Sequence, residues 1–409
     1  MLKCRPDDLA IFGGPPHFAE PLHVGRPNVG NRERFFERLN DLLDRRWLSN
    51  NGKYVQEFEA RIAERLGVKH CVAVCNGHVG LEIAARALDL SGEVIVPSMT
   101  FVSTAHALKW LGLDPVFCDV DDETYTLDPR RVEEAIGPRT SAILGVHLWG
   151  APCAVEELAS IARRRGLRLF FDAAHAFDCS HQGRMIGGFG DAEVFSFHAT
   201  KFFNSFEGGA ITTNDDEVAR RARLMRNFGF SDYDTVVSVG TNGKMSEAAA
   251  AMGLTNLEDI DEFTTANYEN YLAYRAAIKN IDGLTLVSGV ALGRQNYQYV
   301  VVDVDPMVTG LSRDDLVELL WAENVRARRY FVPGCHRVEP YRSLGAAAPL
   351  PVTERVLDRV LTLPTGTALG PAAIADICDL MRFAVDHGED VARRLAARRA
   401  GCGPDTTRK

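Results

Sequence analysis

Asp172 and Lys201 are the two residues whose surroundings point most directly to chemistry. Asp172 ends the apolar stretch LRLFF, and ligands of open α/β sheets gather at the carboxyl ends of the strands. A carboxylate in that place would be partly desolvated and would need a partner. Lys201 follows the stretch EVFSF and precedes Phe202 and Phe203. Desolvation by such neighbours lowers the pKa of a lysine and exposes the neutral amine that Schiff-base chemistry requires.

Gly77 and Phe101 also follow predicted strands. Gly77 precedes the helical stretch HVGLEIAARAL, and a close backbone approach with free helix N–H groups suits a phosphate. Phe101 follows EVIVP and could stack on a planar ring. Taken singly, each feature has an ordinary explanation, such as a helix cap, a surface lysine, a tight turn or a core phenylalanine. Together they match pyridoxal phosphate (PLP), which needs a lysine for its aldehyde, an anion for its ring nitrogen and a helix start for its phosphate.

Short apolar β-type runs alternate with helical periodicity through the first two thirds of the chain. This alternation predicts an α/β fold with a mostly parallel sheet covered on both faces. The last two runs are separated by loop alone, so we expect the sheet to depart there from simple alternation. The expected strands cover 70–74, 93–97, 115–120, 142–148, 167–173, 193–197 and 209–213, with helices near 58–66, 78–88, 101–111 and 155–165.

The pattern changes near residue 265. We expect a large domain over residues 1–265, including the N-terminal segment, and a smaller C-terminal α/β domain over 266–390. Residues 391–409 are rich in Arg and then polar, which favours a flexible tail. The smaller domain is expected to contain helices at 268–279, near 314–323 and from about 372, and a strand at 297–304.

The composition is that of a soluble globular protein, with 46% apolar and 25% charged residues among 409. The formal charge of -9 disfavours a nucleic-acid partner. Nine scattered cysteines without Cys-x-x-Cys pairs give no sign of a metal site. The first residues do not resemble a signal peptide, and no apolar stretch approaches the roughly 20 residues of a membrane helix. We therefore expect a cytoplasmic protein without a membrane partner.

From about WLSNNGKYVQEFE (47–59) to YFVPGCHRVEPYRS (330–343) the chain resembles the PLP-dependent sugar aminotransferases of the DegT/StrS group. Residues 171–213 carry the most specific part of the similarity. The resemblance implies fold type I, the aspartate aminotransferase-like fold of PLP-dependent transferases. It also implies a homodimer with active sites at the subunit boundary.

The resemblance also implies roles at the cofactor ring. Lys201 would carry the cofactor covalently and move the proton. Asp172 would pair with the ring nitrogen, His175 would lie near the ring hydroxyl and Phe101 would stack on the ring. The nearby His198 is expected to be a packing residue or to support the site from behind.

Other roles concern the phosphate and the substrate. Ser196 would bind the phosphate beside the backbone of Gly77 and His78. Asn242, in the segment GTNGKMSEAAAAMGLTNLEDID (240–261), would reach the phosphate of the partner subunit. The segment that in relatives lies close to the sugar contains Tyr330 and His336.

Two residues depart from the family pattern. His78 stands where the family usually has threonine, although an imidazole can still donate a hydrogen bond. Lys53 stands where many relatives have proline. Lysine at 201 favours transamination, because the dehydrating members of the family replace it with histidine.

The resemblance favours transfer of an amino group from L-glutamate to C4 of a nucleoside-diphosphate 4-keto-6-deoxyhexose, for which dTDP is the expected nucleotide. Such enzymes supply amino sugars for secondary metabolites, including antibiotics. Action at C3 of a 3-keto sugar is the alternative within the family. A PLP lyase or desulfurase would need a nucleophilic cysteine, for which Cys335 and Cys179 are the candidates. A non-catalytic regulator would need a partner-binding extension or a lost lysine, and the sequence shows neither.

Overall fold

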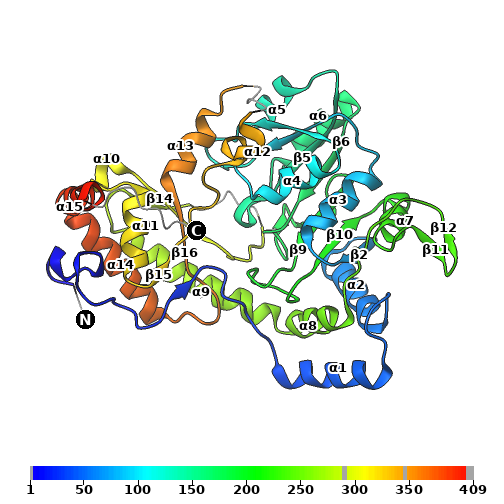
Figure 1. Ribbon diagram of the computed structural model, residues 1–409, viewed down its shortest axis with the longest axis horizontal. Coiled ribbons are helices and arrows are strands. Elements are labelled where there is room, and N and C mark those ends of the chain that lie inside the picture. Colours follow the sequence, from blue (N-terminus) through cyan, green and yellow to red (C-terminus); the bar gives the residue numbers. More distant parts are fainter. Residues whose placement is uncertain (1–2, 288–292, 344–347, 402–409) are drawn as a thin grey trace.

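A seven-stranded sheet organises the larger lobe of the computed structural model, which describes residues 3–287, 293–343 and 348–401 (Figure 1). The strand order is β2-β10-β9-β6-β5-β3-β4. Strand β10 is antiparallel to β2 and β9, and the other neighbours are parallel. The predicted α/β class and the predicted departure from alternation are both confirmed. The strands are β2 (His70–Val74), β3 (Glu93–Pro97), β4 (Asp114–Cys118), β5 (Thr140–Val146), β6 (Arg168–Asp172), β9 (Ala192–Ser196) and β10 (Gly209–Thr213).

Both faces of this sheet are buried, because successive side chains of a strand point to opposite sides. On β6, Phe170 packs toward α3, α4 and α7, whereas Leu169 and Phe171 pack toward α5 and α6. Helices α2 and α8 cover the part of the second face next to β2 and β9. The helices are α2 (Lys53–Leu66), α3 (Gly77–Ala87), α4 (Val102–Trp110), α5 (Pro129–Ala135), α6 (Val155–Arg165), α7 (Asp216–Met225) and α8 (Glu247–Glu258).

The smaller lobe contains an antiparallel sheet of order β13-β14-β16. The long helix α9 (Ile260–Ile278) leads into it from the large lobe (Figure 1). The other elements of this lobe are β13 (Leu284–Leu286), β14 (Val300–Val304), β16 (Val360–Leu363), α10 (Pro306–Thr309), α11 (Arg313–Ala322), α13 (Pro351–Arg359), α14 (Pro371–Asp386) and α15 (Gly388–Gly401).

The N-terminal arm belongs to the smaller lobe, which differs from the expected division of the chain. Leu9 and Ile11 are buried in the core of that lobe, and β1 (Leu22–His23) pairs with β15 (Val325–Arg326). Residues of the arm therefore pack against residues that are far away in the sequence. The short apolar run around Leu9 carries no periodic signal that would have indicated its partner.

The prediction of a flexible tail from residue 391 is wrong as far as residue 401. Helix α15 continues to Gly401, and Val391 and Leu395 are fully buried in the core of the smaller lobe. These two apolar residues lie one turn apart on one helix face, and the neighbouring Arg394 and Arg399 pair with acidic residues. Residues 402–409 lie outside the described part of the chain.

Several further elements complete the structure. Within the described residues, no helix is both long enough and apolar enough to span a bilayer. These elements are α1 (Arg32–Arg45), α12 (Glu339–Arg342), β7 (Ser180–His181), β8 (Arg184–Met185), β11 (Phe230–Asp232), β12 (Thr235–Val236) and the 3-10 helices η1 (Pro6–Asp8), η2 (Ala10–Phe12), η3 (Leu148–Gly150) and η4 (Cys335–Arg337).

Candidate active site

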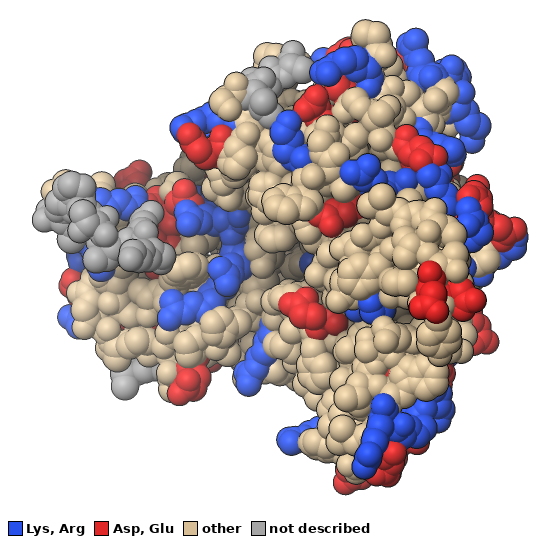
Figure 2. All heavy atoms as spheres, turned by 45° about the vertical axis from the view of Figure 1, so that its right-hand side comes forward, with Lys and Arg blue, Asp and Glu red and all other residues tan. Residues whose placement is uncertain are grey.

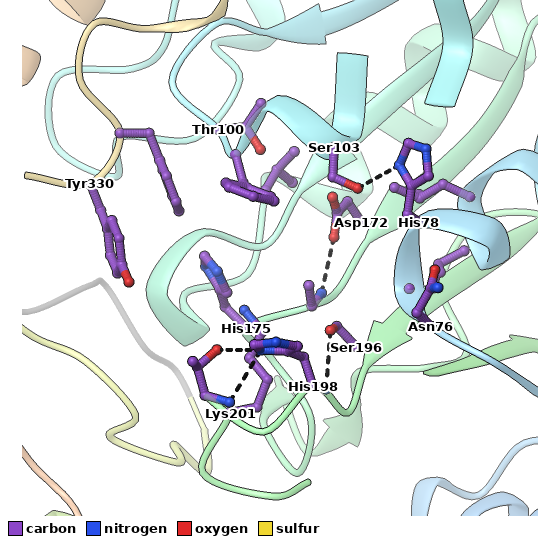
Figure 3. Close-up of a pocket in the computed structure, with 18 of the residues that line it drawn as sticks. Asn76, His78, Thr100, Ser103, Asp172, His175, Ser196, His198, Lys201 and Tyr330 are labelled. Atoms are coloured by element: carbon purple, nitrogen blue, oxygen red, sulfur yellow. Dashed lines mark hydrogen bonds between the residues drawn. The ribbon is translucent and has the colours of Figure 1, made fainter. Parts of the chain in front are cut away.

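A cavity of about 340 Å³ lies at the carboxyl ends of the strands of the large sheet (Figure 3). Segments that follow β2, β3, β6 and β9 form most of its wall, and the smaller lobe adds side chains near β14 and β15. This is where ligands of open α/β sheets bind. The structure brings together here the predicted residues Gly77, His78, Phe101, Asp172, His175, Ser196, Lys201 and Tyr330.

Asp172 ends strand β6, and its side chain reaches the cavity while the residue is only 7% exposed. Its Oδ2 atom accepts a hydrogen bond from Thr104 Oγ1 (2.8 Å), and its Oδ1 atom accepts one from the backbone N–H of Ala174 (3.1 Å). Burial raises the pKa of this carboxyl group, while the two hydrogen bonds and the charge of Lys201 act in the opposite direction. The carboxylate is therefore desolvated, fixed in direction and in need of a cationic partner.

Lys201 lies in the loop after β9, where its backbone N–H donates to the carbonyl of His198 (2.8 Å). Burial lowers the pKa of the Lys201 ammonium to about 8, and the charge of Asp172 partly opposes this shift. A substantial fraction of the amine is then neutral near physiological pH. The neutral amine is the form that adds to carbonyl groups and accepts protons from carbon.

His175 is 6% exposed and lies between the two lobes. Its Nδ1 atom accepts a hydrogen bond from the backbone N–H of Trp149 (3.3 Å), so the proton of the neutral ring is on Nε2. The ring stacks on Phe331 at a centroid distance of 5.7 Å. Burial and the nearby charge of Lys201 hold the pKa of His175 well below its usual value. His175 is thus a neutral hydrogen-bond donor in a fixed orientation.

The start of helix α3 approaches the end of β9 so closely that a side chain at residue 77 would crowd Ser196. A Cβ atom at Gly77 would lie 3.0 Å from the Cβ atom of Ser196. The side chain of Asn76 caps the helix by accepting from the N–H of Val79 (2.9 Å). The first N–H groups of the helix remain available beside the Ser196 hydroxyl. Such a turn is a ready-made anion site.

The imidazole of His78 is engaged with its own helix and with α4. Its Nδ1 atom shares a hydrogen bond with Ser103 Oγ (2.8 Å), and its Nε2 atom lies 3.4 Å from Glu82 Oε1. The ring lines the cavity together with Ser103 (Figure 3). Residue 78 is histidine and not the usual threonine. As a result, the His78 imidazole and the Ser103 hydroxyl lie at this end of the cavity as a hydrogen-bonded pair.

Phe101 and Tyr330 form an aromatic wall on the side of the smaller lobe. Phe101 precedes α4 and is 57% exposed, with its ring centroid 6.1 Å from that of Phe331. Tyr330 stacks on Phe331 at 4.8 Å. Phe101 has one open face, as a stacking platform requires.

Two predicted residues lie outside this cavity. His336 is held by Ser98, whose hydroxyl lies 2.6 Å from His336 Nδ1, and its Nε2 atom lies 3.5 Å from Glu354. Asn242 is exposed, and its backbone forms an isolated bridge with Asn227. The structure of one chain thus does not bring either residue to this cavity.

Several residues that line or support the site were not predicted as site residues. Tyr299 comes from the strand region 297–304, in which no spacing singled it out. Thr104 holds Asp172 from the first turn of α4, and no sequence signal indicates that pairing. His198, expected to pack or support the site, lines the cavity, shares a hydrogen bond with Thr200 (2.8 Å) and lies 3.4 Å from Glu207.

The cysteines that a lyase or desulfurase would need are unsuitable. Cys179 and Cys335 are both buried and do not line the cavity. Burial raises the pKa of each thiol to about 12. Thiols of this kind are protonated and inert at neutral pH.

Comparison with known proteins agrees with this geometry. Residues 30–382 match the model of the DegT/DnrJ/EryC1/StrS aminotransferase family. The dTDP-4-amino-4,6-dideoxy-D-glucose transaminase of Shigella dysenteriae is 38% identical over 365 residues, which cover 89% of this chain and 99% of the relative. The GDP-perosamine synthase of Caulobacter vibrioides is 34% identical over 86% of this chain and 95% of the relative. The solved structure of DesI in the presence of its TDP-sugar product superposes with a TM-score of 0.92 at 52% identity, covering 97% of this chain and 100% of DesI.

The family match covers most of the chain, and the cavity contains a desolvated lysine and a buried carboxylate. The two findings agree. The chain belongs to the DegT/DnrJ/EryC1/StrS aminotransferase family.

Proposed function

We propose that this aminotransferase uses PLP to move an amino group from L-glutamate to C4 of a dTDP-4-keto-6-deoxyhexose. One observation carries the proposal: a single cavity joins the lowered-pKa amine of Lys201, the buried carboxylate of Asp172 and the helix start at Gly77 beside Ser196. The names of the relatives from Shigella dysenteriae and Escherichia coli specify a 4-amino-4,6-dideoxy sugar of dTDP. They support the choice of C4 and of the nucleotide.

The residues of the cavity fit PLP. Asp172 would hold the protonated ring nitrogen, because its desolvated carboxylate lacks a cationic partner of its own at hydrogen-bonding distance among the described residues. Phe101 would cover one face of the ring, and His175 Nε2 would donate to the ring hydroxyl. The phosphate would lie at the start of α3, against Ser196. When bound, PLP supplies an aldehyde that combines with primary amines and a ring that accepts electrons from the neighbouring carbon.

The protein residues account for the proton movements. Lys201 Nζ, as a neutral base, removes the proton from the α-carbon of the amino donor and later returns one to the carbon of the acceptor sugar. Asp172 keeps the ring nitrogen protonated throughout. The aromatic wall of Phe101, Tyr330 and Phe331 limits the access of water to the reacting atoms. Two half-reactions at one site predict ping-pong kinetics.

A second cavity next to the first suits a nucleoside diphosphate. It has a volume of about 370 Å³, shares Thr100, Phe101, Tyr330 and Phe331 with the first cavity, and is also lined by Arg328 and Arg329. Side chains of Lys and Arg gather along the small-lobe margin of the recess between the lobes (Figure 2). Guanidinium groups bind diphosphates through charge-assisted hydrogen bonds, which supports an acceptor that carries one.

We also propose that the enzyme is a homodimer in which Asn242 reaches the phosphate of the partner subunit. Large apolar side chains are exposed on α1 and on the hairpin of β11 and β12, among them Phe36 (51%), Leu43 (54%) and Val236 (58%). A second copy of the chain would cover these side chains. Asn242 follows that hairpin in sequence and is free to face a neighbouring subunit.

The test is to incubate the purified protein with PLP, L-glutamate and a panel of 3-keto and 4-keto deoxysugars linked to dTDP. Nuclear magnetic resonance of the products identifies the carbon that gains nitrogen. We expect nitrogen at C4 of a 4-keto-6-deoxyhexose. Amination of a 3-keto sugar instead would make the enzyme a C3 aminotransferase.

A matched pair of lysine variants controls this test. Lys201→Ala should abolish turnover, whereas Lys279→Ala, at an exposed position at the end of α9, should leave it unchanged. Full activity of Lys201→Ala would contradict the proposal.

A further inference from the structure

Tyr299 enters the cavity from the smaller lobe, immediately before strand β14. Its hydroxyl lies 3.5 Å from Lys201 Nζ. Among residues 3–287, 293–343 and 348–401, it is the only side chain within hydrogen-bonding distance of that amine. The ring of Tyr299 stands edge-on to His175 at 4.8 Å and edge-on to Tyr330 at 5.8 Å. Rings on two sides thus hold the phenol in place.

The segment that carries Tyr299 is tied to the loop after β6. Asn296 Nδ2 donates to the carbonyl groups of His175 and Phe177, at 2.9 Å each. The backbone N–H of Ser180 donates to the carbonyl of Arg294 (2.9 Å), and the N–H of Arg294 donates to Ser180 Oγ (2.7 Å). The small-lobe segment therefore has a fixed position relative to His175.

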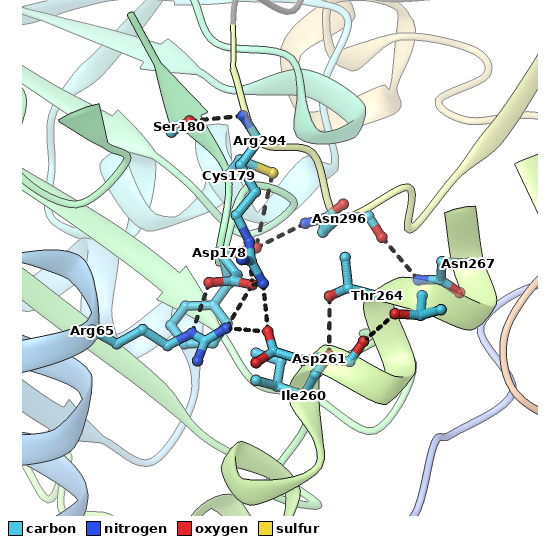
Figure 4. A network of polar contacts seen from close by, with 12 residues as sticks. Arg65, Asp178, Cys179, Ser180, Ile260, Asp261, Thr264, Asn267, Arg294 and Asn296 are labelled. Atoms are coloured by element: carbon cyan, nitrogen blue, oxygen red, sulfur yellow. Dashed lines mark hydrogen bonds and ion pairs between the residues drawn. The ribbon is translucent and has the colours of Figure 1, made fainter. Parts of the chain in front are cut away.

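An ion-pair network strengthens the same connection (Figure 4). Asp178 is 1% exposed and binds the guanidinium groups of both Arg294 (2.6 Å) and Arg65 (2.7 Å). Asp261, at the start of α9, binds the same two arginines. Asp178, a buried carboxylate paired with two arginines, fixes this geometry, and Asp261 adds an exposed pair of contacts to the same arginines. The position of Tyr299 is thus built into the contact between the lobes.

We propose that Tyr299 is a positioning residue for the amine of Lys201 in the aminotransferase reaction. A phenol can accept a hydrogen bond from the ammonium form and donate one to the neutral amine. It can therefore hold Nζ in both protonation states through which a proton-moving lysine passes. Burial raises the pKa of Tyr299, so the phenol stays protonated. The inference rests on the proposed function, because it assumes that Lys201 moves the proton.

The groups around Lys201 differ in what they offer the amine. Asp172, on β6, attracts the ammonium by its charge, and Tyr330 also faces Lys201. His175 is neutral and faces the same space. Among the described side chains, only Tyr299 offers an oxygen atom at hydrogen-bonding distance, so within that part of the chain its removal leaves the amine without a directional partner.

The kinetic test compares Tyr299→Phe with Tyr297→Phe. Tyr297 lies two residues earlier and contacts Tyr268 and Tyr271, away from the cavity. For Tyr299→Phe we expect kcat to fall about tenfold, which is the loss of one directional hydrogen bond, with KM for glutamate within about threefold. The primary isotope effect with α-deuterated glutamate should rise, because proton transfer becomes slower relative to the other steps. Tyr297→Phe should change none of these, and an unchanged isotope effect in Tyr299→Phe would overturn the proposal.

A second readout is independent of activity. The full-length protein without cofactor is labelled with an amine-acylating reagent at a series of pH values, and the extent of labelling at Lys201 is measured by peptide mapping, with Lys279 as internal reference. Charge-assisted hydrogen bonds are stronger than neutral ones, so loss of the phenol oxygen disfavours the ammonium. The labelling midpoint of Lys201 should therefore move to lower pH in Tyr299→Phe and stay in place in Tyr297→Phe. Equal midpoints in the wild type and Tyr299→Phe would overturn the proposal.

Fluorotyrosine at position 299 serves if the phenylalanine variant does not fold. Its hydroxyl is a weaker acceptor, so the midpoint of Lys201 should again move to lower pH, and an unchanged midpoint would overturn the proposal. The labelling result does not depend on transamination. If no keto sugar or glutamate reacts but the midpoint still moves, the proposed function fails while the contact between Tyr299 and Lys201 stands.

Discussion

The two ends of the active-site cavity are built differently. At the inner end, Asp172 and His175 are less than a tenth exposed, and each has hydrogen-bond partners within the same chain. At the outer end, Gly77, His78 and Ser196 are only partly buried and present backbone N–H groups and a hydroxyl. The inner end is arranged to set reactivity and the outer end to retain an anion. Substitutions should therefore separate rate from cofactor affinity.

Asp172→Asn is expected to have the largest effect, at the inner end. The amide keeps the shape of the side chain but cannot hold a proton on the cofactor ring nitrogen by its charge. We expect the rate constant of the glutamate half-reaction to fall about 100-fold or more, measured by stopped-flow absorbance with cofactor-saturated protein.

A matched control for this variant is Asp128→Asn. Asp128 is equally buried, at 6% exposed, but it caps helix α5 outside the cavity. The control should react at the wild-type rate. A rate for Asp172→Asn within threefold of the wild type would show that the inner end does not set reactivity.

The pH dependence of cofactor attachment is the next test of the inner end. Only the neutral amine of Lys201 attacks an aldehyde, and the pKa of Lys201 is lowered to about 8. The attachment rate at saturating PLP should rise about tenfold per pH unit below about pH 8 and level off above it. Because the charge of Asp172 raises the pKa of Lys201, Asp172→Asn should move the break to lower pH. A break that stays near the ordinary lysine value, or that moves upward in the variant, contradicts the account.

Ser196→Ala tests the outer end. Loss of one hydrogen bond to a charged phosphate should weaken PLP binding by about tenfold, measured by equilibrium dialysis, with the half-reaction rate at saturating cofactor within about threefold. Ser91→Ala, at an exposed position before β3, should bind as the wild type does. If Ser196→Ala lost rate rather than affinity, the division of labour between the two ends would be wrong.

His78→Thr should have the smallest effect. The imidazole is already engaged with Ser103 and Glu82, and threonine restores the hydroxyl that the family usually has at this position. We expect PLP affinity within about threefold of the wild type, because the backbone N–H groups of the turn are unchanged. A tenfold loss of affinity would show that the imidazole itself contacts the phosphate.

Much of the inner end could be predicted because local sequence dictates it. Asp172 ends one apolar strand and Lys201 lies in the loop after another, and the carboxyl ends of such strands meet at one edge of a sheet. The partners Thr104 and Tyr299 could not be predicted. They approach from other strands and from the other lobe, and their pairing depends on tertiary packing that leaves no periodic trace in the sequence.

The fold shows the same contrast between features that the sequence could predict and features that it could not. The seven strands of the large sheet and helices α2, α3, α4 and α6 follow hydrophobic periodicity and lie within a few residues of where it predicted them, whereas α5, α7 and α8 were not predicted. The N-terminal arm and helix α15 were misplaced for a common reason: their few apolar residues, such as Leu9 and Leu395, are buried only against the smaller lobe. An Arg-rich helix with a narrow apolar face is hard to distinguish from a solvated tail by composition alone.

The central claim is that the amine of Lys201 carries the cofactor. Borohydride reduction of the protein loaded with PLP, followed by peptide mapping, tests it most directly. The account predicts one pyridoxyl group per chain on the peptide that contains Lys201, and none on that peptide in Lys201→Ala. Absence of the adduct from the wild-type peptide, or its presence mainly on another lysine, would contradict it.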